Sequence, residues 1–244
     1  MDLDGTGIQQ LTDASSIAGY TGDESSSFHG SAAAVVLPRT TGEVCEVIRR
    51  AAARRTPLTL SGAGTSITGS RVPRDGVVLG TERLRDVRDL EAGVCHGGSG
   101  AERYAGWREL SGGDHRILLS PDGKRACVPA GVRLSELDRL LAPQGRLYPP
   151  DPTERTAMLG GTIATNASGA RSYRYGATRN WVEALLVVTT GGEACWIQRG
   201  AYVAMGGELD LPGAFPASAL SIPALPMPRT KHAAGLYLAP EMDL

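Results

Sequence analysis

SGAGTSITG, residues 61–69, is the stretch that decides the fold of this chain. It follows directly on residues 57–60, a short apolar run that predicts a strand. Its glycines leave no Cβ in the way, so successive backbone N–H groups can converge on an anion, and its Ser and Thr hydroxyls add further donors. The stretch therefore predicts a loop that holds a phosphate or diphosphate without a metal. A plain glycine-rich turn is the alternative interpretation.

Two familiar phosphate loops do not match this stretch. It lacks the Gly-Lys-Ser/Thr ending of a Walker A loop, and its glycine spacing is not that of the Rossmann fingerprint. No helical pattern follows it. A dinucleotide-binding Rossmann module is therefore not favoured.

The residues around the loop predict a small α/β unit. Residues 34–37 form an apolar run that predicts a buried strand, and residues 77–79 form another. A capping box at Thr40 and Glu43 predicts a helix between the first two strands. Its apolar positions recur at helical spacing: Val44, Val47, Ile48, Ala51 and Ala52. The unit ends near residue 80 and follows an irregular or partly helical lead-in.

The rest of the chain predicts hairpins and a helix. Residues 117–119 and 126–128 form one hairpin, and residues 184–189 and 194–197 form another. Between them, Leu134, Leu137, Leu140 and Leu141 lie on one face of a predicted helix.

Two further segments have no regular pattern. Residues 91–115 are polar and glycine-bracketed, so we interpret them as an insertion or long loop. The proline-rich tail from Leu211 onward predicts a segment that wraps a surface.

A second ligand-approach segment lies downstream of the loop. Pro149-Pro150-Asp151-Pro152 stiffens the chain, and LGGTIATNASGA, residues 159–170, combines glycines with Thr, Asn and Ser side chains that can bind a polar ring edge or a phosphate. Asp151 taken alone is better explained as a turn former or a helix cap. Two such segments about a hundred residues apart imply a long ligand that is touched at both ends.

Composition narrows the function classes. The chain has 244 residues and a formal net charge of −1, with no stripe of Lys and Arg, so we expect no nucleic-acid partner. The isolated cysteines show no metal-ligand spacing, so we expect no metal. The N-terminus is acidic and polar, and no apolar run is long enough to span a bilayer. We therefore expect a cytoplasmic protein, with attachment to the inner face of a membrane as the alternative.

Four motifs in this order resemble one flavoprotein family. They are SGAGTSITG, VPAGVRLSELDRLLAPQG, YPPDPTERTAMLGGTIATNASGARSYRYGATRNWVEALLVV and TTGGE. Together they resemble the FAD-binding domain (PCMH-type) of the vanillyl-alcohol oxidase/p-cresol methylhydroxylase family, and within it the D-lactate dehydrogenase and glycolate oxidase subunit group. The resemblance runs from about residue 20 to the C-terminus.

The resemblance implies an α+β fold of two α/β subdomains with non-covalent FAD between them. We assign residues 1–30 to a lead-in, residues 31–82 to subdomain 1 and residues 83–244 to subdomain 2. The residues that the resemblance places at the diphosphate are Gly62, Ala63, Gly64, Thr65, Ser66 and Gly69. Those that it places along the flavin and its ribityl chain are Pro150, Asp151, Thr156, Gly160, Gly161, Thr165, Ser168 and Gly169.

The implied activity is the oxidation of a small 2-hydroxy acid such as D-lactate, glycolate or D-2-hydroxyglutarate, with hydride transfer to FAD. The electrons would pass to a quinone, a cytochrome or another carrier. Rival expectations are another reaction on this fold, of the alkylglycerone-phosphate synthase, sugar or alditol oxidase or NADPH-linked reductase type, and a catalytically silent FAD-binding fragment.

The chain departs from the family pattern in three places. The loop usually begins with Arg, and Ser61 takes that place here. Lys231 lies in a degenerate copy of a family segment and is either a substrate-carboxylate or flavin contact or a solvated lysine. The substrate-binding half is absent, so we expect a truncated chain, or a separate chain that supplies the remainder. We assign no catalytic base, and we expect His29, His96, His115 and His232 to be surface or loop residues.

Overall fold

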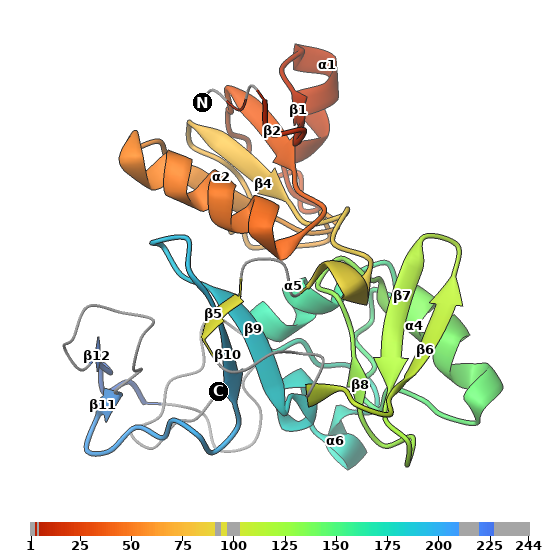
Figure 1. Ribbon diagram of the computed structural model, residues 1–244. Coiled ribbons are helices and arrows are strands. Elements are labelled where there is room, and N and C mark those ends of the chain that lie inside the picture. The colour runs from red at the N-terminus through yellow and green to blue at the C-terminus, as the bar shows by residue number, and fades with distance from the viewer. Residues whose placement is uncertain (1–2, 4, 91–93, 97–102, 210–219, 227–244) are drawn as a thin grey trace.

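The computed structural model describes residues 3, 5–90, 94–96, 103–209 and 220–226 (Figure 1). It has mixed helices and strands in two parts, as predicted. The first part holds one four-stranded sheet, and the second holds smaller sheets, one of them mixed, and short helices.

The first sheet has the strand order β1-β2-β4-β3. Its strands are β1 (Gln9–Leu11), β2 (Ala34–Leu37), β3 (Leu58–Ser61) and β4 (Val77–Gly80). Strands β2, β4 and β3 are parallel, and β1 pairs antiparallel with β2. The three predicted strands are confirmed, and the lead-in adds β1.

Helix α2 (Thr41–Ala53) covers one face of this sheet. Thr40 Oγ1 accepts a hydrogen bond from Glu43 N at 3.1 Å, so the predicted cap is confirmed. The helix packs through its apolar face on Val36, Val77 and Leu79, a core cluster buried to 1% exposure or less. Ala52 is exposed, so the predicted stripe is one residue too long.

The opposite face of the sheet is covered by the lead-in. Helix α1 (Ala14–Ile17) and the 3-10 turn η1 (Ala18–Tyr20) place Ile17 and Tyr20 against Val35, Leu37 and Val78. The sheet therefore has apolar cover on both faces, as a buried parallel sheet requires.

The second part begins with the 3-10 turn η2 (Val87–Asp89) and a three-stranded antiparallel sheet. The strands are β6 (Arg108–Gly112), β7 (His115–Leu119) and β8 (Ala126–Cys127). The four leucines of helix α4 (Leu134–Leu141) are buried, as predicted, and Leu137, Leu140 and Leu141 share a core cluster with this sheet. The 3-10 turn η3 (Ala142–Gln144) extends the helix to Gly145.

Residues 91–115 were predicted to be an insertion or a long loop; the long-loop alternative is wrong for the described part of the segment, and the insertion stays a prediction. The segment contains β5 (Val94–His96), parallel to β10, and β6. In β6 only Leu110 is buried and the other residues are exposed. The sequence of this strand therefore does not alternate between apolar and polar residues, which is the pattern that predicts a strand. His115 was expected to be a surface or loop residue, but it begins strand β7, its side chain is buried and Nε2 lies 2.8 Å from Glu136 Oε2.

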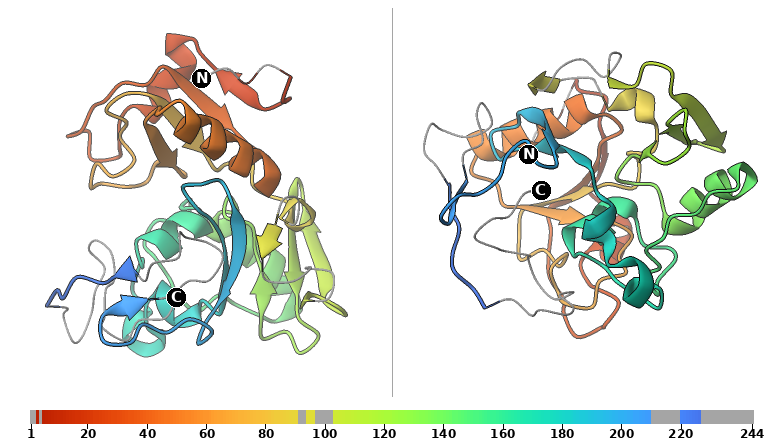
Figure 2. Two further views of the ribbon diagram at one scale, coloured as in Figure 1. Left: turned by 60° about the vertical axis from the view of Figure 1, so that its left-hand side comes forward. Right: turned by 90° about the horizontal axis from the view of Figure 1, so that it is seen from below.

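A hairpin connects the two parts. Strands β9 (Ala184–Val188) and β10 (Ala194–Gln198) pair as predicted, and their turn at Gly192 packs against Cys45 and Arg49 of α2. Figure 2 shows the turn reaching that helix.

The remaining elements are short. They are α5 (Leu159–Ala164), α6 (Ser172–Tyr175), the 3-10 turn η4 (Thr178–Trp181) and the strand pair β11 (Glu208–Leu209) and β12 (Leu220–Ser221). Within the described ranges, no helix is both long enough and apolar enough to cross a membrane. Most of the proline-rich tail lies outside those ranges.

Candidate functional site

Loop 61–69 leaves the carboxyl end of β3, where Ser61 pairs with Gly80 of β4. Gly64 has φ +87°, in the left-handed region that glycine adopts without strain. Within the part of the chain that the structure describes, the backbone N–H groups of residues 62–67 donate no hydrogen bond. Such consecutive free donors are what an anion such as a diphosphate requires.

Hydroxyl groups line the far side of the loop. Ser66 Oγ lies 3.1 Å from Thr68 Oγ1 and 3.3 Å from Ser70 Oγ. All three residues are at least partly exposed, and Thr65 precedes them. They add neutral donors beside the free N–H groups.

The lead-in holds the loop from outside. Glu24 N donates to Ser66 O at 2.9 Å, and Gly69 N donates to Asp23 Oδ2 at 2.7 Å. The hydroxyl of Ser25, followed by the N–H groups of Gly69 and Ser25, holds the pKa of Asp23 below its ordinary value. The lead-in thus contributes to the site, which the sequence did not indicate.

Arg71 lies under the loop, with 9% of its surface exposed. Its Nε donates to Ser61 Oγ at 3.1 Å, Nη1 to Gly22 O at 2.9 Å and Nη2 to Gly19 O at 3.1 Å. Sequence reasoning gave this residue no role. The available signal was an arginine two residues after the end of a loop whose first position, usually Arg in the resembled family, is Ser61 here.

The second segment presents a helix start. Leu159 N donates to Val132 O at 2.9 Å and Gly160 N to Ala130 O at 3.0 Å, which ties the start of α5 to the turn that precedes α4. Gly161 N donates to no acceptor among the described residues, and nothing lies within 4 Å of the position a Cβ would take there. Gly161 therefore leaves an open N–H donor in the first turn of α5.

Other glycines of this segment pack against protein. A Cβ on Gly169 would lie 1.6 Å from Asp151 O, and one on Gly160 would lie 2.8 Å from Ala130 Cβ. Gly169 also forms an isolated antiparallel β-bridge with Pro152. The absence of a side chain at these positions serves backbone packing, and their predicted contact with the flavin stays a prediction.

Asp151 is an ion-pair centre. Its Oδ1 lies 2.8 Å from Arg155 Nη1 and its Oδ2 lies 3.0 Å from Arg171 Nε. Arg155 also pairs with Asp138 of α4. The turn or cap role expected for Asp151 is replaced by these pairs, because both arginines reach its carboxylate from later in the chain.

The remaining predicted residues have local partners or burial. Thr156 Oγ1 donates to Glu154 Oε1 at 2.7 Å, and Thr165 Oγ1 donates to Gly161 O at 3.0 Å. Pro150 is buried and Ser168 is half-buried. Lys231 and His232 lie outside the described residues.

The two segments meet at Thr81. Its hydroxyl lies 3.3 Å from Ser61 O and 3.7 Å from Met158 Sδ, the residue before α5. Figure 1 shows α5 on the side of the second part that faces the four-stranded sheet. The start of loop 61–69 and the start of α5 therefore lie close together, on either side of Thr81.

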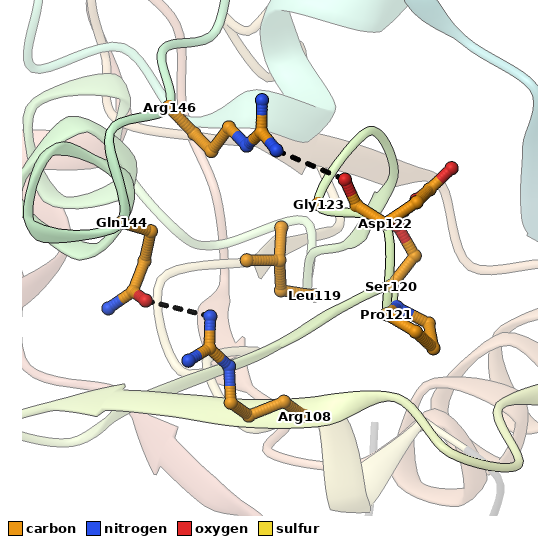
Figure 3. Close-up of a pocket in the computed structure, with 8 residues that line it drawn as sticks. All are labelled: Arg108, Leu119, Ser120, Pro121, Asp122, Gly123, Gln144 and Arg146. Carbon is orange, nitrogen blue, oxygen red and sulfur yellow. Dashed lines mark hydrogen bonds between the residues drawn. The ribbon is translucent and has the colours of Figure 1, made fainter.

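A separate cavity of about 320 Å³ lies elsewhere, between the β7–β8 turn and η3 (Figure 3). Arg108 donates to Gln144 Oε1 at 2.7 Å and Arg146 donates to Asp122 O at 3.1 Å at its edges. It shares no residue with either predicted cofactor segment.

Comparison with known proteins shows which family this chain resembles. The sequence profile described as "FAD binding domain" matches residues 32–198. The chain is 31% identical over 159 residues to a D-lactate dehydrogenase of Archaeoglobus fulgidus, covering 65% of this chain and 29% of that protein. It is 35% identical over 162 residues to a D-2-hydroxyglutarate dehydrogenase of Xanthomonas citri pv. viticola, covering 66% of this chain and 28% of that protein.

A solved structure shares the fold. An alkyldihydroxyacetonephosphate synthase superposes with a TM-score of 0.59 at 20% identity, covering 78% of this chain and 31% of that one. The chain thus spans less than a third of each of these proteins.

Proposed function

Because the chain belongs to the FAD binding domain family, with FAD as its cofactor, we propose that it is the FAD-binding portion of a dehydrogenase that oxidises a small 2-hydroxy acid. The family resemblance that the four motifs predicted is confirmed. Relatives named as D-lactate and D-2-hydroxyglutarate dehydrogenases support the substrate class. The observation that carries the proposal in the structure is the run of free N–H groups at residues 62–67, next to α5.

In the proposed mechanism this chain binds and orients the cofactor. The N–H groups of residues 62–67, which donate to no protein acceptor among the described residues, would hold the diphosphate, and the open N–H of Gly161 would donate to the flavin half of the ligand. The ion pairs of Asp151 with Arg155 and Arg171 fix the chain around α5. When bound, FAD supplies the acceptor for the hydride that leaves the substrate carbon.

The substrate site and the electron path involve further partners. We propose that Lys231 contacts the substrate carboxylate or the flavin, and that a further domain or a separate chain completes the site. The electron acceptor is a quinone, a cytochrome or another carrier. The protein works in the cytoplasm or at the inner face of a membrane.

Cofactor binding is tested by the visible absorbance spectrum of the purified chain and by titration with FAD. Flavin bands or saturable binding are expected. Absence of both, also for a chain extended with the rest of its gene product, would contradict the proposal.

Substrate class is tested on the full-length gene product with D-lactate, glycolate and D-2-hydroxyglutarate and a dye acceptor. Flavin reduction by at least one of them is expected. If FAD binds but none of them reduces it, the cofactor assignment stands and the substrate class is wrong.

A further inference from the structure

The guanidinium of Arg71 is a buried charge with fixed partners. It is 9% exposed and donates to three acceptors from two regions of the chain: Ser61 Oγ, Gly22 O and Gly19 O. Burying a cation costs free energy unless hydrogen bonds compensate it, so these contacts fix the group in one place. That place is directly under the loop, because a Cβ on Gly64 would lie 2.9 Å from Arg71 Nη1.

We propose that Arg71 is the positioning residue of the diphosphate loop. It ties Ser61, the first residue of the loop, to the Gly19–Gly22 segment, and it supplies positive charge beneath the free N–H groups. The inference rests on the proposed function, since the diphosphate is that of FAD.

Its geometry suits arginine and not lysine. The three acceptors lie in different directions around one planar group, and a guanidinium presents donors in a fixed fork, whereas an ammonium is a single point. The ring of Tyr20 lies 6.0 Å from the guanidinium carbon, and the hydroxyl of Tyr20 donates to Glu82. A polar network therefore continues from the loop to the face of the sheet covered by η1.

The contact with Ser61 explains a departure seen in the sequence. Ser61 takes the place where the loop of the resembled family usually begins with Arg, and its hydroxyl accepts a hydrogen bond from the guanidinium of residue 71. The positive charge that residue 61 lacks is thus present at the same end of β3.

The experiment compares Arg71→Met, Arg71→Lys and Ser61→Ala with Arg74→Met in the 244-residue chain. Arg74 is the matched control, an exposed arginine three positions further on. Two quantities are measured: the FAD dissociation constant, and amide hydrogen exchange of the FAD-free protein in residues 19–24, 62–69 and 134–141.

We expect Arg71→Met to weaken FAD binding by roughly ten- to hundredfold, the range for lost hydrogen bonds to a charged group. Exchange should accelerate in residues 19–24 and 62–69 and stay unchanged in residues 134–141. Arg71→Lys should fall between wild type and Arg71→Met, Ser61→Ala should show a smaller effect, and Arg74→Met should match wild type.

Two results would overturn the inference. One is an Arg71→Met chain that matches Arg74→Met in both measurements, and the other is exchange that accelerates equally in residues 134–141, which would indicate a general structural role. If Arg71→Met does not fold, Arg71→Lys decides by the same criteria. If neither the wild-type chain nor the extended chain binds FAD, the proposed function is overturned, while the exchange data still decide whether Arg71 holds the loop.

Discussion

Loop 61–69 and the segment over residues 150–169 are both rich in glycine, and they meet at Thr81. In the loop, Gly64 adopts a left-handed conformation above Arg71, and the neighbouring N–H groups have no protein acceptor among the described residues. In the second segment, Gly169 instead lies against the carbonyl of Asp151. One region uses glycine to leave donors open, and the other uses it mainly to bring two backbones together.

The difference shows that glycine content alone does not distinguish a ligand contact from a packing contact. What distinguishes them is the atom that a Cβ would meet. In the second segment only Gly161 combines an open Cβ position with a free N–H among the described residues, so it alone there resembles the loop.

The largest effect is expected for Gly169→Ala. Its Cβ would lie 1.6 Å from Asp151 O, and a backbone carbonyl cannot move aside as a side-chain end can. We expect a loss of at least about 3 kcal/mol in the free energy of unfolding, measured by urea titration.

Gly161→Ala is the control for that substitution. No heavy atom lies within 4 Å of the position of the added Cβ, and alanine favours the helix more than glycine does. The free energy of unfolding should therefore be unchanged or up to about 1 kcal/mol higher, while FAD affinity falls. Equal stability of the two variants would remove the distinction between packing and ligand glycines in this segment.

Gly64→Ala should have the next largest effect. A left-handed alanine costs roughly 1–2 kcal/mol, and its Cβ would press on Arg71. Gly145→Ala carries the same backbone cost at φ +64°, with nothing within 4 Å and far from the loop in the sequence. Only Gly64→Ala should also raise the FAD dissociation constant. A matching rise for Gly145→Ala would mean that strain anywhere weakens binding.

Asp151→Asn tests the ion pairs that fix the second segment. The carboxylate is 26% exposed and its arginine partners are 31% and 39% exposed, so solvent screens the pairs and we expect a loss of about 1 kcal/mol. Glu46→Gln, which breaks the surface pairs of α2 with Arg49 and Arg50, should cost less. Thermal unfolding of both variants makes the comparison, and a larger loss for Glu46→Gln would contradict it.

The smallest effect on stability is expected from protonation of Asp23 at low pH. The folded protein holds the pKa of Asp23 below its ordinary value, so its contribution to stability is present well above the unfolded-state pKa and is lost as the pH falls through the folded-state pKa. In strong acid the melting temperature of wild type should therefore fall more steeply with falling pH than that of Asp23→Asn. Parallel curves would show that this carboxylate does not stabilise the loop.

Sequence patterns predicted the local parts of the fold. The cap at Thr40, the leucine face of α4 and the β9–β10 hairpin depend on residues a few positions apart, so periodicity and turn chemistry are sufficient to identify them. Strands β1 and β6 were missed because their stability comes from pairing with strands that have the apolar pattern they lack.

The candidate site was predicted in its loops but not in its supports. The free donors of residues 62–67 follow from the motif itself. Arg71 was missed because its acceptors at Gly19 and Gly22 lie about fifty residues earlier, and the partner of Gly169 is a carbonyl that no motif specifies. Contacts of this kind depend on how distant segments are brought together, which a single sequence does not display.

The β9–β10 turn resting on α2 has a mechanical consequence. The two parts already touch at Thr81, and the turn at Gly192 adds a second contact between them. Two separate contacts restrict rotation of one part against the other more than a single contact would. We therefore expect a bulkier residue at 192 to press on Cys45 and Arg49 of α2 and to change how the two parts lie against each other.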